Sequence, residues 1–400
     1  MSNELTAFNP ELWRAEMQET FFKESTALGV ASVDLRAELS VGDVLHQPYG
    51  SYARVQTYTK GTDITVKDVS ATDDYLTVDT AKVASFYVDD LDKVQNKYDA
   101  LSNFAKGAMS QLNNVIDQAV INSGKSNANT TLTGASIGEA AGGIVFTPAN
   151  TANVATAQGR ILDTNKRLRG ERFWMIGPRM KETIVNYVGG RETGFGDTVS
   201  DNGMVAKRFG FDLVLSNNLP WEGALEITTA VTDGDTVTIN GVAFTFKTTL
   251  GSTAGNVLIG ADAAASRVNL VKAINDTGTV DTHYVQLSAE NRQLLEESGL
   301  VATDSIANTQ VDFVGYGDIV VSETLTSGNN VWHDTFQYSL AGIKGSVALV
   351  AQVAPNVVFR DAQLRLGKYV HPWTLFGVKT FERMKRALVA AKFDTSSWVA

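Results

Sequence analysis

The clearest alternation of apolar and polar residues in the chain lies between Asp233 and Lys247, in the sequence DGDTVTINGVAFTFK. The Asn240-Gly241 pair predicts a β-hairpin, because this dipeptide suits the positive backbone angles of a two-residue type I′ turn. One face of the hairpin is then apolar, and the other is mostly threonine. The turn also fixes the register of the two strands, which pairs Ile239 with Val242, Val237 with Phe244, Thr238 with Ala243 and Thr236 with Thr245.

The longest helical pattern covers residues 90–122, where apolar residues recur at alternating spacings of three and four. We expect a helix of about 50 Å that ends at the Asn-Ser-Gly sequence of 122–124, since glycine favours helix ends. A coiled coil is the alternative, but small alanine positions and flanking strand patterns favour a helix that lies on a sheet. A short amphipathic helix is predicted for residues 10–23, after a cap at Asn9.

Residues 42–90 have a different character. Strand-like runs at 52–59 and 75–89 are joined by a polar segment, and neither has a long apolar face. This pattern predicts an extended β-hairpin that cannot bury itself alone and therefore needs a partner surface.

Helical and strand patterns alternate between residues 152 and 220, as in an α/β domain. The pattern predicts a helix at 152–169, a buried strand in RFWMIGP, a helix in RMKETIVNYVGG and a strand in FDLVLSNNLP that ends at Pro220-Trp221. The glycine-rich segment 191–210 is predicted to be a mobile loop. Strand patterns return in FQYSLAGIKGSVALVAQVAP and continue from Asn356.

Charge divides the chain into two unlike parts. The net charge is −10, and residues 225–330 contribute −9 of it through 13 acidic and 4 basic residues, whereas residues 360–392 carry 8 basic and 2 acidic residues. Such an acidic block should repel nucleic acid. Its two ends are asparagine-rich and close to tryptophans, so we predict that residues 224–331 form a folded α/β or β-rich domain, inserted at an exposed turn.

Within this acidic block the pattern predicts further elements after the hairpin. Val268, Val271 and Ile274 form a helical stripe, residues 289–298 suit a second helix, and strands are expected at 283–287, QVDFVG and DIVVSETL.

Catalytic chemistry is not indicated by any motif. The chain has no cysteine, which excludes disulfides, thiolate metal sites and a cysteine nucleophile, and its four histidines are isolated in the sequence. The glycine pairs at 194–196 and 315–317 lack the context of a dinucleotide fingerprint and are interpreted as turns. The acidic pairs at 73–74, 89–90 and 296–297 suit capping or solvation. We therefore predict no enzyme, no cofactor and no metal.

Membrane and secretion signals are missing as well. The first residues, MSNELTAFNPELW, have no basic segment followed by an apolar one, and no run of about 18 apolar residues occurs. With 44% apolar and 20% charged residues, the chain has an ordinary globular composition, and its 400 residues favour two or three domains.

The order of these elements resembles the major capsid protein of tailed bacteriophages, the Hong Kong 97-type fold. The resemblance covers residues 5–223 and 332–395 and is carried by order and length, including the long helix, RFWMIGPRMKETI, GFDLVLSNNLP and the C-terminal run NVVFRDAQLRLGKYVHPWTLFGVKTFERMKRALV. It implies an α+β fold with an N-terminal arm (1–43), an extended hairpin or E-loop (44–89), a peripheral domain (90–150 and 345–400) with a spine helix at 90–122, an axial domain (151–223 and 332–344) and the inserted acidic surface domain (224–331).

The resemblance also implies a function and its partners. Copies of such a chain form hexamers and pentamers of an icosahedral shell around double-stranded DNA, bound without sequence specificity. The protein would meet a scaffolding protein, a portal protein and a decoration protein, but no membrane, and would be located in the virion after assembly in the host cytoplasm. Assembly contacts are expected at Trp13, Phe21, Phe22, Tyr52, Tyr58, Lys60, Lys67, Gly194 and Gly196.

Two features differ from some relatives. Those relatives begin with a scaffold-like segment that is later cleaved, whereas this chain begins at the arm, so a separate scaffolding protein is expected. Others crosslink a hairpin lysine to an asparagine of another subunit; Lys60 or Lys67 could stand there, but nothing in the sequence supports the rest of that set. A tail or adhesion component and an α/β enzyme with an unrecognised site are the alternative functions.

Overall fold

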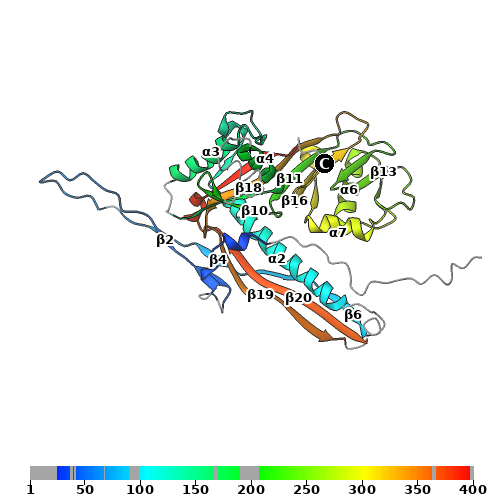
Figure 1. The fold of residues 1–400 in the computed structure, drawn as a ribbon, viewed down its shortest axis with the longest axis horizontal. Coiled ribbons are helices and arrows are strands. Elements are labelled where there is room, and N and C mark those ends of the chain that lie inside the picture. Colours follow the sequence, from blue (N-terminus) through cyan, green and yellow to red (C-terminus); the bar gives the residue numbers. More distant parts are fainter. Residues whose placement is uncertain are drawn as a thin grey trace, which may run out of the picture.

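The computed structural model describes residues 25–36, 39, 42–66, 68–90, 100–165, 170–189, 207–362 and 366–396. Figure 1 shows four parts: a central sheet with helices α3 and α4, an elongated sheet that lies along helix α2, a lobe that contains α6 and α7, and a hairpin that extends far from the rest. Residues 225–330, which carry most of the negative charge, are called the acidic lobe below.

The central sheet has nine strands within the described residues. Its main order is β15-β16-β11-β18-β8-β10-β9, and β21 pairs with both β18 and β7. The strands are β7 (Thr130–Leu132), β8 (Arg172–Ile176), β9 (Lys207–Arg208), β10 (Phe211–Leu215), β11 (Pro220–Glu226), β15 (Val301–Ser305), β16 (Gln310–Tyr316), β18 (Trp332–Ile343) and β21 (Leu388–Asp394).

Two helices and a buried strand confirm the predicted α/β order. Helix α3 (Thr151–Thr164) and helix α4 (Pro178–Gly189) flank β8, in which Phe173 to Ile176 are at most 2% exposed. The strand predicted to end at Pro220-Trp221 is wrong in extent. β10 ends at Leu215, and Pro220 opens β11, because the chain leaves its parallel pairing with β8 and enters antiparallel pairing with β16 and β18.

The elongated sheet contains β5 (Thr80–Val83), β6 (Phe86–Asp89), β19 (Ala348–Asp361) and β20 (Gly367–Lys379). Helix α2 (Ala100–Asn127) lies along one face of this sheet, as the sequence predicts. Its predicted end at 122–124 is wrong. Gly124 lies inside the helix, where an added Cβ would collide with the Leu340 side chain, so this glycine allows close helix–sheet packing and does not end the helix. Residues 91–99 lie outside the described part.

The C-terminal run does not stay in one sheet. β19 and β20 pair along most of their length in the elongated sheet, but β21 pairs with β18 and β7 in the central sheet. The predicted peripheral domain at 345–400 stays a prediction, and its last strand, β21, pairs within the central sheet. Short 3₁₀ turns complete the chain: Ala27–Gly29, Asp34–Arg36, Gly134–Ile137, Ile306–Asn308 and Met384–Ala387.

The acidic lobe has a hydrophobic core of its own. It contains a four-stranded sheet of β12 (Thr236–Ile239), β13 (Val242–Lys247), β14 (Asn256–Leu258) and β17 (Val321–Glu323), with α6 (Ala263–Asn275) and α7 (Ala289–Glu297). The predicted hairpin is confirmed in every pair of its register. Asn240 and Gly241 have φ angles of 51° and 80°, and Val237, Ile239, Val242 and Phe244 are fully buried.

Other details of the lobe differ from expectation. Val268 is 36% exposed while Leu270 and Ile274 are buried, so the inner face of α6 is rotated from the predicted stripe. Residues 283–287 form no strand, because only Tyr284 makes isolated bridges there. Gly315 lies within β16 and is not a turn residue; a Cβ on it would collide with Ile319.

Strand β11 belongs to both the central sheet and the lobe. It pairs with β18 on one side and with β16 on the other, so the predicted boundary at 224 falls within a strand. The two ends of the predicted insert do meet, since Glu226 and Val331 exchange backbone hydrogen bonds of 2.9 and 3.1 Å. They meet inside the sheet and not at an exposed turn. A separately folding domain at 224–331 stays a prediction.

A buried carboxylate attaches the first described residues to α2. Asp117 is fully buried and accepts hydrogen bonds from the Ser25 hydroxyl (2.8 Å), the Ala27 backbone N–H (2.6 Å) and the Asn218 side-chain amide (3.0 Å). One side chain therefore joins the N-terminal segment, α2 and the link before β11.

We expect Asp117→Ala to lower the free energy of unfolding by about 3 kcal/mol, because the buried Ala27 N–H, one N–H of the buried Asn218 amide and the half-buried Ser25 hydroxyl lose their acceptor. Asp117→Asn keeps one carbonyl oxygen and should lose about half as much. Urea unfolding of the full chain measures both. Equal stability of the alanine variant and the wild type would contradict this role.

Candidate functional site

The projecting hairpin is the most exposed part of the described chain. Its root is formed by β1 (Val44–His46) paired with β4 (Tyr75–Thr77), and β2 (Tyr49–Gly50) paired with β3 (Ala71–Thr72). Beyond the Ser51–Ser70 backbone hydrogen bond of 2.7 Å the two limbs run without assigned strand pairing to a turn at residues 59–62. Figure 1 shows this part extending away from both sheets. The predicted hairpin is thus shorter in paired structure, because β5 and β6 belong to the elongated sheet.

Large apolar side chains on the hairpin are exposed. All described residues from 51 to 66 are exposed. The exposed fractions of the large ones are Tyr52 84%, Val55 101%, Tyr58 63%, Ile64 69% and Val66 88%. Solvent-exposed apolar groups gathered on one projection indicate a contact surface that another molecule completes.

The predicted contact residues fall into two groups. Tyr52, Tyr58 and Lys60 lie together on the hairpin, with Lys60 at its turn before Gly61. Trp13, Phe21, Phe22, Lys67, Gly194 and Gly196 lie outside the described residues, as do the short N-terminal helix and most of the glycine-rich loop. A contact role for any of these residues stays a prediction.

Sequence reasoning missed the other apolar residues of the hairpin. Val55, Ile64 and Val66 are single β-branched residues among polar neighbours, a pattern that is ordinary in a strand. The sequence did contain one indication: the polar segment has no second apolar run that could cover these residues. Only the structure shows that nothing in the described chain reaches them.

A second uncovered apolar surface lies on the elongated sheet. Helix α2 covers the face that carries Phe86 and Phe376, and the hairpin root covers the near end of the opposite face through Leu76 and Val78. At the far end of that opposite face the side chains are exposed or half-buried. This open sheet face consists of Val83, Tyr87, Tyr369, His371 and Trp373, with Val83 63% and Tyr369 37% exposed.

Contacts between neighbouring rings hold the side chains of the open sheet face in place. The rings of Tyr87 and Tyr369 have centroids 5.3 Å apart, and Tyr369 stacks on His371 at 6.0 Å. His371 also bonds to the Ser85 hydroxyl at 2.9 Å. Rigid aromatic side chains of this kind contribute much of the binding energy at protein interfaces, because little rotamer freedom is lost on binding.

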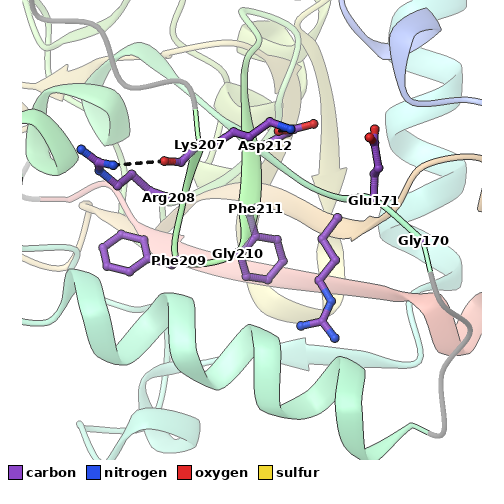
Figure 2. Close-up of a pocket in the computed structure, with 9 residues that line it drawn as sticks. Gly170, Glu171, Lys207, Arg208, Phe209, Gly210, Phe211 and Asp212 are labelled. Atoms are coloured by element: carbon purple, nitrogen blue, oxygen red, sulfur yellow. Dashed lines mark hydrogen bonds and ion pairs between the residues drawn. The ribbon is translucent and has the colours of Figure 1, made fainter.

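The cavity drawn in Figure 2 has a volume of about 490 Å³ and lies between the start of β8 and the β9–β10 turn. Figure 2 shows Lys207 and Asp212 at one side of it and the rings of Phe209 and Phe211 at the other. Lys344 bridges Glu171 (2.9 Å) and Asp212 (2.8 Å), and Lys207 also pairs with Asp212 (3.1 Å).

These ion pairs shift the pKa values of two groups beside the cavity. Hydrogen bonds from Lys344 and Lys207 hold the pKa of Asp212 below its usual value, and the hydrogen bonds that Lys344 donates to Asp212 and Glu171 raise the pKa of Lys344. Asp212 and Lys344 are therefore ionised near neutral pH and paired with neighbouring charges. The described lining has no nucleophile beside a base.

A second group of charges joins α2 to the central sheet. Lys125 pairs with Glu222 and lies 3.9 Å over the ring of Tyr338, whose hydroxyl donates to Glu222 at 2.8 Å. Burial opposes ionisation of Glu222, but the hydrogen bonds from Lys125 and Tyr338 and the positive charge of Lys125 together lower its pKa. Burial, and then Glu222 itself, raise the pKa of Tyr338. The cluster connects the last turns of α2 with β11 and β18.

Glu222→Gln is expected to destabilise the chain at pH 7 but not in acid. A carboxyl with a lowered folded-state pKa stabilises the fold above its unfolded value of about 4.3, and this contribution is lost as pH falls through the folded-state pKa. Urea unfolding at pH 7 and at successively lower pH should show the two proteins converging. Glu290→Gln, an exposed change of the same charge, should stay within about 0.5 kcal/mol of wild type throughout. A difference that persists in acid would contradict this prediction.

Metal and membrane sites are not seen in the described part of the chain. It holds no cluster of three or more histidine, aspartate or glutamate side chains suited to a metal ion. None of its helices combines the length and the apolar character needed to cross a lipid bilayer.

Comparison with known proteins identifies the fold. No family model matches the sequence, and no curated protein matches it. Among solved structures, the chain is similar to one from Mycobacterium phage Che8, with a TM-score of 0.59 and 14% identity over 98% of both chains. It is also similar to the capsid structure of cyanophage P-SCSP1u, with a TM-score of 0.54 and 14% identity over 98% of this chain and 95% of the other.

A third likeness, to the capsid asymmetric unit of cyanophage Pam1, has a TM-score of 0.54 and 9% identity over 99% of this chain and all of the other. Because such identities are low, the likeness concerns the fold. It confirms the predicted α+β fold of phage capsid structures over nearly the whole chain.

Proposed function

We propose that this chain is the structural major capsid protein of a tailed phage, whose copies associate into hexamers and pentamers of an icosahedral shell. The observation that carries the proposal is the projecting hairpin, whose large apolar side chains are exposed in a chain that has a phage capsid fold. A hairpin that is exposed in one copy becomes buried when copies assemble. Hydrophobic burial then drives association.

The open sheet face is the best candidate to receive the hairpin of a neighbouring copy. The same subunit carries both surfaces: the hairpin exposes large apolar side chains, and the open sheet face exposes Val83 and Tyr369 beside three half-buried rings. A contact between two different patches of one chain is heterologous, and such contacts close into rings when their rotation permits. Together with other contacts, the buried area would exceed about 2,000 Å², as in obligate assemblies.

Charge supports one orientation of the subunit in the shell. The acidic lobe carries −9, and the rest of the chain together carries only −1. Packaged DNA repels a strongly acidic surface, so the lobe would face outward and the near-neutral remainder inward. The DNA would be held without sequence specificity.

The remaining predicted partners belong to the same proposal. A scaffolding protein would guide assembly in the host cytoplasm, a portal protein would occupy one vertex, and a decoration protein could bind the outer surface of the virion. The proposed role needs no catalysis.

Electron microscopy of the purified full chain, alone and co-expressed with its scaffolding protein, tests the proposal. We expect rings or closed shells. A species that stays strictly monomeric under all these conditions would contradict it. Assay of the purified chain for bound metal or nucleotide separates the proposal from an enzymatic function.

A further inference from the structure

The direction of the projecting hairpin is set by contacts at its root. On the outgoing limb, Arg383 donates a hydrogen bond to the Gly50 carbonyl. Its guanidinium also lies 5.5 Å from the ring centre of Tyr49 and 5.3 Å from that of Tyr52. The planar cation thus contacts one carbonyl and two aromatic rings within residues 49–52 of this limb.

The return limb is held by the same turn of the chain and by Lys379, the last residue of β20. Asp74 accepts a hydrogen bond of 2.7 Å from the Glu382 backbone N–H and pairs with Lys379 at 3.4 Å. Lys379 in turn lies 5.8 Å from the ring centre of Tyr75. Since both limbs are held, bending the hairpin root in either direction stretches one set of contacts.

The turn that makes these contacts, residues 380–387, is also the connection between the two sheets. It follows β20 of the elongated sheet and leads into β21 of the central sheet. It is attached to the end of α2, because Thr380 bonds to Ser123 (3.0 Å) and the Asn129 N–H donates to the Lys385 carbonyl (3.1 Å). A rotation of one sheet relative to the other must therefore move this turn.

We propose that Arg383 and Asp74 are positioning residues that couple the direction of the hairpin to the angle between the two sheets. The inference rests on the proposed function for its purpose, since a hairpin direction matters only when a second copy receives the hairpin. In an assembly, copies whose sheets differ in angle would then point their hairpins differently. The turn 380–387 transmits the geometry of the subunit body to its neighbour contact.

The absence of cysteine in the chain makes a direct measurement practical. Thr62→Cys at the hairpin turn and Thr156→Cys on α3 are both exposed sites and take spin labels without competition. Pulsed electron paramagnetic resonance of the unassembled full chain then gives the distribution of distances between hairpin and body. The wild-type background should give a narrow distribution.

Arg383→Ala combined with Asp74→Ala should broaden this distribution by about twofold or more, because the root then samples several directions. Arg386→Ala is the matched control: the residue has the same charge and the same turn, and it is exposed. Arg383→Lys tests the planar group, and it should broaden the distribution by an intermediate amount. Circular dichroism of each variant excludes unfolding as the cause.

Two results would overturn the proposal: a wild-type distribution as broad as that of the double variant, or a double variant as narrow as the Arg386→Ala control. These distances are measured on single chains, so they decide the positioning role even if no shell forms. If the wild type assembles, the double variant should give fewer closed shells and more irregular ones. Unchanged shells from a variant with a broadened hairpin would overturn the link to assembly alone.

Discussion

Replacing residues 53–68 by Asn-Gly is expected to abolish shell formation while the chain itself stays folded. The two-residue turn closes the hairpin directly after Tyr52, so the contacts of Arg383 at the root are kept. The replacement removes Val55, Tyr58, Ile64 and Val66, none of which is buried within the chain. Stability against urea should therefore change little.

The expected effect on assembly is large because interface energy is concentrated in a few apolar anchors. Losing even two such residues at about 2 kcal/mol each lowers association by about 700-fold. The assembled fraction is measured by sedimentation and electron microscopy. Asp63→Asn changes the same hairpin without removing apolar area and should assemble as the wild type does. Closed shells from the shortened hairpin would contradict the role of these side chains.

Trp221→Ala is expected to lower the free energy of unfolding by about 3–5 kcal/mol, as for other fully buried large aromatic residues. Trp221 is fully buried in the core of the acidic lobe, although it lies before the predicted start of that domain, and its Nε1 donates to the Thr395 hydroxyl at 3.3 Å. The strand that carries it is paired on both sides. The lobe and the central sheet should therefore lose stability together.

Amide hydrogen exchange of the full chain separates this outcome from a local one. In the Trp221→Ala variant, protection should fall both in the lobe strands and in β18. Val314→Ala, a 45% exposed residue on the neighbouring strand, should cost less than about 1 kcal/mol and leave protection unchanged. Loss of protection in the lobe alone would show that the lobe is an independent unit, as the sequence suggests.

Local features of the sequence were sufficient to predict several elements correctly. The hairpin at 236–247 is determined by turn chemistry and alternation within one short segment, so its register could be derived before any tertiary contact was known. Strand β8 and helices α3 and α4 are likewise specified by their own apolar patterns.

The errors arise where a distant partner decides the structure. The local sequence around Gly124 predicts a helix end. In the structure, Gly124 packs against Leu340, which is more than two hundred residues away in the sequence. The sequence predicts one strand up to Pro220-Trp221. The pairing of β11 with β16 and β18 divides this segment into the end of β10 and the start of β11. β21 resembles the strands before it in composition, yet its partners lie in the other sheet.

The candidate site was predicted in part for the same reason. Tyr52, Tyr58 and Lys60 could be placed on the hairpin from residue type and position alone. The open sheet face could not, because Val83 and Trp373 come together only through the pairing of β5 with β20. Arg383 lies far from the hairpin in sequence, and no pattern connects it with Gly50.

The shared strand β11 also bears on how such a chain can change over generations. A domain joined through a flexible linker can be gained or lost by a single recombination event. Here a deletion of the lobe would leave β11 with an unpaired edge and Trp221 without its packing partners. Once the sheet had come to depend on β16, selection for a stable subunit would retain the lobe, whatever advantage first favoured it.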